Sequence, residues 1–379
     1  MNWRKWALGA VLFFIVLALS LIWQRHAVAN LLVSLGSPRL VGMAMKSGLN
    51  FNEGYGGSFP IIQAVQRGDQ EMVRYLITAK VNLNVADEHY KTPLIWAIKD
   101  DQPEIAADLM AAGADVNVID SSGWSVLRHA VKKQRMDIAE QIIKLGADVN
   151  TTDNMGLTPL MEAAAADNTK IARLLLSKGA DLTLLDKLNH PALDYLPQKH
   201  DPELGRMLKK VYFVPIGESA SAEIQHLVTY YREKFGLEIN VLPSFRPQPS
   251  DIDEDRRQLI AENLVSSMVR AYPDYARNRA LVLIGITDYD IYPRSVNWQF
   301  VFGWRDFRSH AAIASTARLG LHYFGEAKDQ ATVNRRLCKV VTKDIGLMVF
   351  EKPPNNNPKS VLYDSIGGLE ELDAVGEDF

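Results

Sequence analysis

The sequence is poor in cysteine, because Cys338 is the only one among 379 residues. A single thiol excludes an intrachain disulfide framework and a cysteine-based zinc cluster, but fits either side of a membrane. The net charge is −3 and no cluster of Lys and Arg stands out, which argues against a nucleic-acid partner. The sequence contains no Gly-x-Ser-x-Gly motif, phosphate-binding glycine loop or dinucleotide fingerprint. It therefore gives no basis for a serine hydrolase or a nucleotide-binding protein.

Residues of four types recur every 33 positions in the first half of the chain. They are Asp87, Asp120, Asp153 and Asp186; Leu94, Leu127, Leu160 and Leu193; Ala97, Ala130 and Ala163; and Gly113, Gly146 and Gly179. A fixed period of this length is typical of a stacked solenoid. Thr92-Pro93 and Thr158-Pro159 place a capping hydroxyl and a proline where a helix begins. The glycines fit the left-handed position after a second helix. The unit resembles the ankyrin repeat.

The repeat decays toward both ends, as expected for the terminal units of a solenoid. We predict about five units of two helices each, an all-α array between residues 30 and 198, and a linker over residues 199–210. The resemblance implies protein binding through the tips of the turns that precede each pair. In this chain the tips carry Glu88, His89, Ser121, Ser122, Asn154, Met155, Lys187 and Leu188.

The amino terminus holds an uncharged apolar run of 18 residues, bracketed by Trp6 and Trp23. As a helix it would span roughly 27 Å, close to the ~30 Å of a hydrocarbon core. Arg4 and Lys5 precede it, which favours an amino terminus in the cytoplasm and an exported body, periplasmic or extracellular. The alternative is a signal peptide cleaved near Ala29, after the pattern Ala27-Val28-Ala29. Residues 1–29 are therefore a membrane anchor or a signal peptide.

The 33-residue period is gone after residue 210, where a third region of 169 residues begins. Apolar runs predict strands over 211–216, 237–242 and 280–286, and helical spacing predicts helices over 221–235 and 256–271. This alternation indicates a sheet domain of the α/β or α+β class over residues 211–379. Cys338 lies on an apolar-periodic stretch, so we expect it in the core. The six acidic residues after Lys359 are expected to form a solvated tail.

Several ordered blocks of the third region carry a family resemblance. They are Val211-Tyr-Phe-Val-Pro-Ile-Gly217, Leu283-Ile-Gly-Ile-Thr-Asp-Tyr-Asp-Ile-Tyr292, Phe300-Val-Phe-Gly303 and Ala312-Ile-Ala-Ser-Thr-Ala-Arg-Leu319. Together they resemble the archaemetzincins, zinc proteases of the metzincin type. Arg335-Arg336-Leu-Cys338-Lys339 stands where the active-site helix of that family opens. The resemblance implies a motif His-Glu-x-x-His-x-x-Gly-x-x-His, whose histidines hold zinc and whose Glu deprotonates the bound water.

The motif itself is replaced in this chain. Its first histidine, its glutamate, its second histidine, its turn glycine and its third histidine correspond to Lys343, Asp344, Leu347, Phe350 and Pro353. A protonated lysine, a leucine and a proline supply no lone pair to a metal, and no histidine follows His322. Leu362 stands at the position that matches the Met-turn. We therefore predict a metzincin-like domain with no zinc, no other cofactor and no catalytic residue.

These observations together predict a multidomain, membrane-tethered interaction protein with a catalytically inactive, protease-like domain. The alternative is an exported, membrane-bound metallopeptidase with an unorthodox site. The small, mixed side chains at the turn tips do not indicate which protein is bound.

Overall fold

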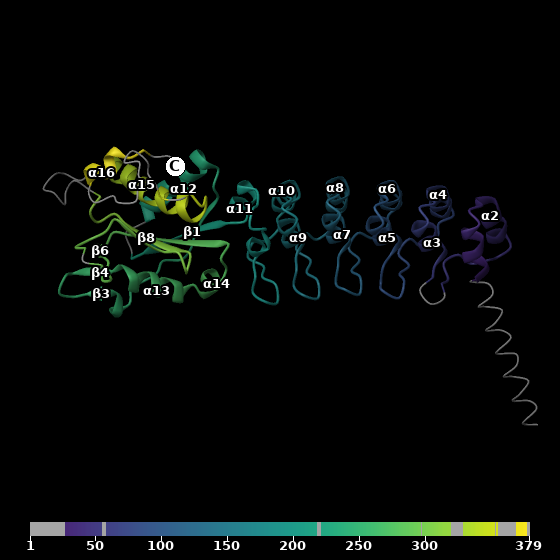
Figure 1. The fold of residues 1–379 in the computed structure, drawn as a ribbon, viewed down its shortest axis with the longest axis horizontal. Helices are drawn as coiled ribbons and strands as arrows, with labels where there is room; N and C mark the ends of the chain where they lie inside the picture. Colours follow the sequence, from purple (N-terminus) through teal and green to yellow (C-terminus); the bar gives the residue numbers. More distant parts are fainter. Residues whose placement is uncertain are drawn as a thin grey trace, which may run out of the picture. The chain divides into compact units, whose positions relative to one another are not determined.

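The computed structural model describes residues 27–54, 58–217, 221–296, 298–319, 329–352, 354 and 369–376 (Figure 1). The chain divides into two compact units, residues 1–180 and 181–379. The apolar run from Trp6 to Trp23 lies outside the described residues. Among the helices of the described part, none combines the length and the apolar character needed to cross a bilayer.

Five helix pairs make up the described part of the first unit. The first pair consists of a helix over residues 27–34 and α2 (Pro38–Lys46). The later pairs are α3 (Pro60–Gln66) with α4 (Gln70–Thr78), α5 (Pro93–Lys99) with α6 (Pro103–Ala111), α7 (Val126–Lys132) with α8 (Met136–Lys144), and α9 (Pro159–Ala165) with α10 (Thr169–Ser177). Successive pairs stack through their first helices and through their second helices.

The helix ends form as the sequence predicts. The hydroxyls of Thr92, Ser125 and Thr158 each accept a hydrogen bond from the backbone N–H three residues later, which satisfies one of the unpaired donors at a helix start. Gly113 and Gly146 follow the second helices with φ of 87° and 91°, a conformation that a side chain would strain. The capping hydroxyls and the left-handed glycines thus fix where the helices begin and end in these repeats.

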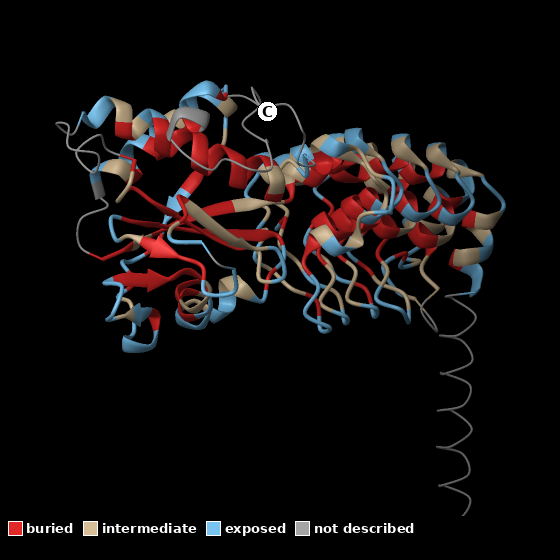
Figure 2. Ribbon diagram, turned by 60° about the vertical axis from the view of Figure 1, so that its left-hand side comes forward, coloured by how far each residue is buried: buried red, intermediate tan, exposed pale blue. Residues whose placement is uncertain are grey.

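The stacked pairs bury the periodic apolar residues. Leu94, Leu127 and Leu160 are buried, as are the alanines three residues after each of them. Figure 2 shows this buried band running through the pairs, with the exposed residues concentrated on the loops and the second helices. Because each apolar face is covered by a neighbouring pair, the stability of one pair depends on the next.

The second unit begins at Asp181 and includes the last, incomplete repeat, with Asp186 and Leu193. It contains a short 3-10 helix, η1 (Ala192–Tyr195), and then α11 (Pro202–Met207), which lies within the segment predicted to be a linker. Leu204 and Leu208 of this segment are fully buried, so it is packed structure. The side-chain amide of Asn278 donates to the carbonyl oxygens of Leu182 and Thr183, which fixes the end of the repeat region within this unit.

The centre of the second unit is a five-stranded sheet with the strand order β2-β1-β5-β8-β7. Its strands are β1 (Lys210–Ile216), β2 (Ile239–Val241), β5 (Leu281–Thr287), β7 (Gly303–Asp306) and β8 (Ala311–Ser315). All neighbours are parallel except the edge strand β7, which runs antiparallel to β8. A small second sheet has the order β3-β4-β6, with β3 (Ile252–Asp253), β4 (Gln258–Ile260) and β6 (Ile291–Tyr292).

Both faces of the five-stranded sheet are covered (Figure 1). One face carries α12 (Ser221–Phe235), α15 (Gln330–Met348) and α16 (Leu369–Ala374); the other carries η2 (Pro249–Asp251), α13 (Ala261–Ala271), α14 (Pro273–Ala276) and the small sheet. Alternate residues of β1 point to opposite faces of the sheet. Phe213 packs in the apolar cluster with α12, α15 and α16, and Val214 packs in the apolar cluster with α13 and the small sheet. The predicted mixed helix and sheet domain is confirmed.

Two details of the sequence prediction are wrong. The helix expected from residue 256 begins at Ala261, because residues 258–260 form β4 and pair with β3 and β6. Residues 369–376 are more than a solvated acidic tail, since Leu372 and Val375 are buried against the core. Asp373 forms an ion pair with Arg336 of α15 at 2.5 Å, so this acidic residue has a structural partner.

We expect the substitution Leu127→Ala to lower the free energy of unfolding of the repeat array by about 3 kcal/mol, because it leaves a cavity between adjacent pairs. Urea unfolding followed by circular dichroism measures this. Ser122→Ala is the matched control on the exposed loop of the same repeat and should change stability by less than about 0.5 kcal/mol. A similar response of both variants would contradict the buried interface described above.

Candidate functional site

The repeats that begin at Asp87, Asp120, Asp153 and Asp186 each open with a loop that we call a finger loop, covering residues 87–91, 120–124, 153–157 and 186–190. In every finger loop, Oδ1 of the first aspartate accepts hydrogen bonds from the backbone N–H groups two and four residues later, at 2.7–3.0 Å. The N–H of the same aspartate donates to the carbonyl oxygen four residues later. The aspartates that revealed the period therefore hold the loop backbone closed.

In three of the four finger loops, the second oxygen of the aspartate binds a side chain further along the chain. Trp96 Nε1 donates to Asp87 at 2.9 Å, His129 Nε2 lies 3.0 Å from Asp120, and Tyr195 Oη donates to Asp186 at 2.5 Å. All three partners stand nine residues after their aspartate, on the helix that follows the loop. Each of these three loops is thus fixed to its own helix as well as closed on itself.

The third finger loop differs, because the residue nine positions after Asp153 is another acid, Glu162. Arg128 of the preceding repeat reaches both carboxylates: it binds Asp153 Oδ2 closely and Glu162 Oε2 at 3.2 Å. Lys132 also binds Glu162, at 2.6 Å, and the Arg128 guanidinium lies 4.0 Å from the ring centroid of Trp124. This network, which is buried apart from Lys132, joins the second and third finger loops through charge.

His129 is buried beside Asp120 and Trp124. Burial, together with the cations Lys91 and Arg128, lowers the pKa of His129 below its ordinary value, although Asp120 acts to raise it. The imidazole is therefore neutral near pH 7, and its hydrogen bond to Asp120 uses Nε2 as the donor.

The structure places all eight predicted tip residues on exposed parts of the finger loops. Successive loops of the first unit are joined by hydrogen bonds: the N–H of Ser121 donates to the carbonyl of His89 at 2.9 Å, and the side chain of Asn154 donates to the carbonyl of Ser121 at 3.1 Å. Glu88, His89, Ser121, Ser122, Asn154 and Met155 therefore lie on three connected loops. Lys187 and Leu188 lie on the fourth loop, in the second unit.

Sequence reasoning missed an aromatic and cationic cluster beside these tips. The Nζ of Lys99 lies 4.1 Å from the ring centroid of Trp96, and that of Lys91 lies 5.9 Å from it. Tyr90 is 64 % exposed on the adjacent loop. The available signal was the 33-residue period, which puts Trp96 at the same position as His129, on the side of the first helix that faces its finger loop.

The positions of the replaced zinc motif lie at the end of α15 and after it. Lys343 and Asp344 are buried, Leu347 is half-buried, and Pro353 lies outside the described residues. Oδ1 of Asp344 accepts a hydrogen bond from Arg305 Nε of the edge strand β7 at 2.8 Å. Its Oδ2 is buried without a hydrogen bond from the protein. Burial raises the pKa of Asp344, although Arg305 and Lys343 act to lower it.

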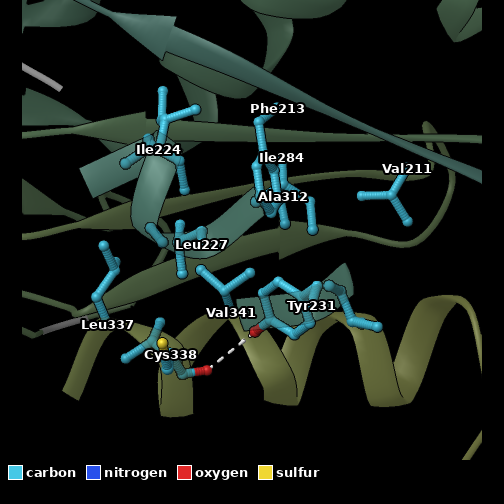
Figure 3. Close-up of a cluster of buried hydrophobic side chains, with 14 of the residues drawn as sticks. Val211, Phe213, Ile224, Leu227, Tyr231, Ile284, Ala312, Leu337, Cys338 and Val341 are labelled. Atoms are coloured by element: carbon cyan, nitrogen blue, oxygen red, sulfur yellow. Dashed lines mark hydrogen bonds between the residues drawn. The ribbon is translucent and has the colours of Figure 1, made fainter. Parts of the chain in front are cut away.

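The buried side chains of α15 pack against α12 and the sheet. Tyr231 of α12 donates to the carbonyl of Cys338 at 3.1 Å and lies 2.8 Å from Thr342 Oγ1 (Figure 3). Cys338 is buried in the same apolar cluster, between Leu337 and Val341 of α15, so the predicted core position is confirmed. In the described part of the chain, no three His, Cys, Asp or Glu side chains come together as a metal site would require. Lys343 and Leu347 do not fit a zinc ion.

The first unit is a solenoid. It consists of stacked helix pairs with capped first helices, and closed loops precede the later pairs. Comparison with known protein families matches residues 25–120 and 103–186 to ankyrin repeats, in three copies. The predicted resemblance of the repeats is thereby confirmed. No curated protein matches the chain.

We expect the stability of the array to depend on pH through His129. Its lowered pKa means that the unfolded chain binds a proton before the folded chain does, so the free energy of unfolding falls as the pH drops through about 6.5. In His129→Gln this part of the pH dependence should be lost, as measured by urea unfolding at a series of pH values. His89→Gln, at an exposed position, is the control and should keep the wild-type dependence. Equal pH dependence in all three proteins would show that His129 titrates normally.

Proposed function

We propose that the chain is a protein-binding scaffold whose binding surface is formed by the finger loops and the adjacent ends of the first helices. Ankyrin repeats are protein-interaction modules, and this supports the general role. The observation that carries the specific proposal is the contrast within each loop. The aspartate and its side-chain partners are held by hydrogen bonds and are buried or half-buried, whereas the tip side chains next to them are exposed.

The chemistry of this surface supports an amphipathic protein partner. Tyr90 and Met155 offer exposed apolar area, while Lys91 and Lys99 place positive charge around the ring of Trp96. Tyrosine and tryptophan are among the residue types that contribute most at protein interfaces. The hydrogen bonds between successive loops reduce the entropy lost on binding, because the loops are already ordered.

We further propose that the scaffold is tethered to a membrane by the run from Trp6 to Trp23, with the body exported. The supporting observations are in the sequence: 18 uncharged residues, flanking tryptophans, and Arg4 and Lys5 on the amino-terminal side. Under the positive-inside rule these charges stay in the cytoplasm.

For the second unit we propose a metzincin-like domain that binds no catalytic zinc and has no peptidase activity. The segment aligned with the active-site helix of the archaemetzincins forms α15, and the replaced motif sits at its carboxyl end. Asp344, at the position of the catalytic glutamate, forms a buried ion pair with Arg305. A carboxylate held in this way, beside a lysine and a leucine in place of two zinc ligands, has no metal-bound water to deprotonate.

We expect the substitutions His89→Ala, Ser122→Ala and Met155→Ala, combined in one chain, to weaken partner capture without lowering stability, since all three positions are exposed. A photo-crosslinking residue at Met155 should attach to the partner in cells. The matched control is a crosslinking residue at Gln141, which is exposed on the second helix α8 of the preceding pair. If the triple variant captures its partner fully while Lys343→Ala with Leu347→Ala abolishes capture, the second unit is the binding module.

We expect the purified chain to hold no stoichiometric zinc and to cleave no peptide, as measured by elemental analysis and a peptide-release assay. Lys343→His with Leu347→His is the matched gain-of-ligand variant, because it places two imidazoles at helical i and i+4 positions. This variant should retain more zinc on dialysis than the parent. Zinc that survives dialysis of the parent, with chelator-sensitive proteolysis, would instead establish a metallopeptidase with an unorthodox site.

A further inference from the structure

The first helix pair, over residues 27–34 and 38–46, has an apolar side that the rest of the described chain leaves uncovered. Its exposed members are Val28 (43 %), Leu31 (57 %), Leu35 (61 %), Leu40 (40 %) and Met43 (67 %). In the same pair Ala29, Val33 and Val41 are fully or almost fully buried against the array. The pair therefore has two apolar sides, and the described residues cover one of them.

Leu40 and Met43 are exposed because they lie on the end face of the described solenoid. Gly36 and Gly68 both have positive φ after a first helix, which aligns the first pair with the second at a spacing of 32. Leu40 then corresponds to Met72, Ile105, Ile138 and Ile171, all of which are buried. Met43 corresponds to Tyr75, whose hydroxyl lies so close to Gly42 of the preceding pair that a Cβ there would clash. In the described part of the chain, the first pair has no such neighbour on this side.

The exposure of Leu31 and Leu35 has a different origin, because the corresponding positions of the later pairs hold other types of residue. Leu31 and Leu35 occupy two positions that carry polar or ring-nitrogen groups in nearly every later pair. The first position holds Gln63, Trp96, His129 and Glu162, and the second holds Arg67, Asp100, Lys133 and Ala166. A solenoid normally ends in a unit with a polar outer face, since that face meets water. Leucine at these places indicates an apolar surrounding instead.

The charges carried by the first pair and by the segment just before it are of one sign. Residues 24–52 contain the basic residues Arg25, Arg39 and Lys46 and no Asp or Glu. Arg39 and Lys46 are exposed on α2 itself. Three residues separate Trp23, where the uncharged run ends, from the first described helical residue, Ala27. An amphipathic, basic helix pair directly after such a run matches the properties of helices that lie in a lipid interface.

We propose that the first helix pair lies on an anionic lipid surface, with Leu31, Leu35, Leu40 and Met43 in the headgroup and acyl boundary. This inference rests on the proposed tether for bringing the pair to the membrane. A second copy of the chain is the less favourable occupant. A two-fold contact through this face would bring Arg39 and Lys46 of both copies into one interface, where like charges repel.

An environment-sensitive fluorophore on single introduced cysteines tests the proposal in the full chain. Leu35→Cys and Met43→Cys are labelled and reconstituted into vesicles of phosphatidylcholine and phosphatidylglycerol that carry a quencher on the acyl chain. The native Cys338 is buried, and the parent chain treated with the fluorophore measures any label that it takes up. Lys133→Cys, at the position of Leu35 in the fourth pair, is the control. We expect strong quenching at positions 35 and 43 and none at 133, with quenching reduced severalfold by Leu31→Gln together with Leu40→Gln in the Met43→Cys chain.

Extraction with alkaline carbonate, which removes proteins that do not span the bilayer, is measured in parallel and reports on the tether separately. A chain that resists extraction but shows no quenching at positions 35 and 43 keeps the tether and overturns the lipid contact. A chain that is extracted and unquenched overturns both. Blue-shifted emission at labelled Met43→Cys without quenching by lipid shows that protein covers the face, and disulfide formation between unlabelled Met43→Cys chains treated with a mild oxidant would identify a second copy. Either result overturns the lipid contact.

Discussion

The array depends on one repeated interaction, in which a buried or half-buried aspartate carboxylate organises each finger loop. One oxygen takes two backbone N–H groups of the loop, and the other takes a side chain from the neighbouring helix. The loop is thereby closed and attached to the helix at the same time. Without this carboxylate the N–H groups would lose their partners and the loop its fixed angle to the stack. The display of exposed tip residues, on which the proposed function depends, follows from this constraint.

The third loop shows what happens when the partner at the ninth position is itself acidic. Asp153 and Glu162 cannot share a hydrogen bond as carboxylates, so Arg128 of the preceding repeat compensates both charges and stacks on Trp124. Burying such charges is costly unless they are paired. The result is a connection between repeats that is ionic as well as apolar, in the middle of the proposed binding surface. His129, next in sequence to Arg128, is kept neutral by the same surroundings.

The second unit uses its buried charges differently. Asp344 pairs with Arg305 across the helix and the edge strand, and Arg336 and Lys339 of the same helix bind the end of α16. These contacts all lie between elements of the second unit, and Oδ2 of Asp344 alone among these carboxylate oxygens is buried without a hydrogen bond. Tyr231, Thr342 and Cys338 complete a helix whose buried face is committed to packing. The buried side chains of this helix thus hold it against α12, β7 and α16.

The sequence by itself determined the period, the caps, the turn glycines, the strands β1 and β5 and the buried Cys338, because these follow from short-range geometry and from spacing. It also located the tip residues, since they stand at fixed offsets from the aspartates. Only the tertiary structure decided that residues 258–260 form a strand, that α16 returns to the core and that Arg128 bridges two carboxylates. Each of these depends on a partner far away in the chain or in another repeat. The exposed leucines of the first pair belong to the same class, because a residue that looks like core in sequence becomes surface when no neighbour packs against it.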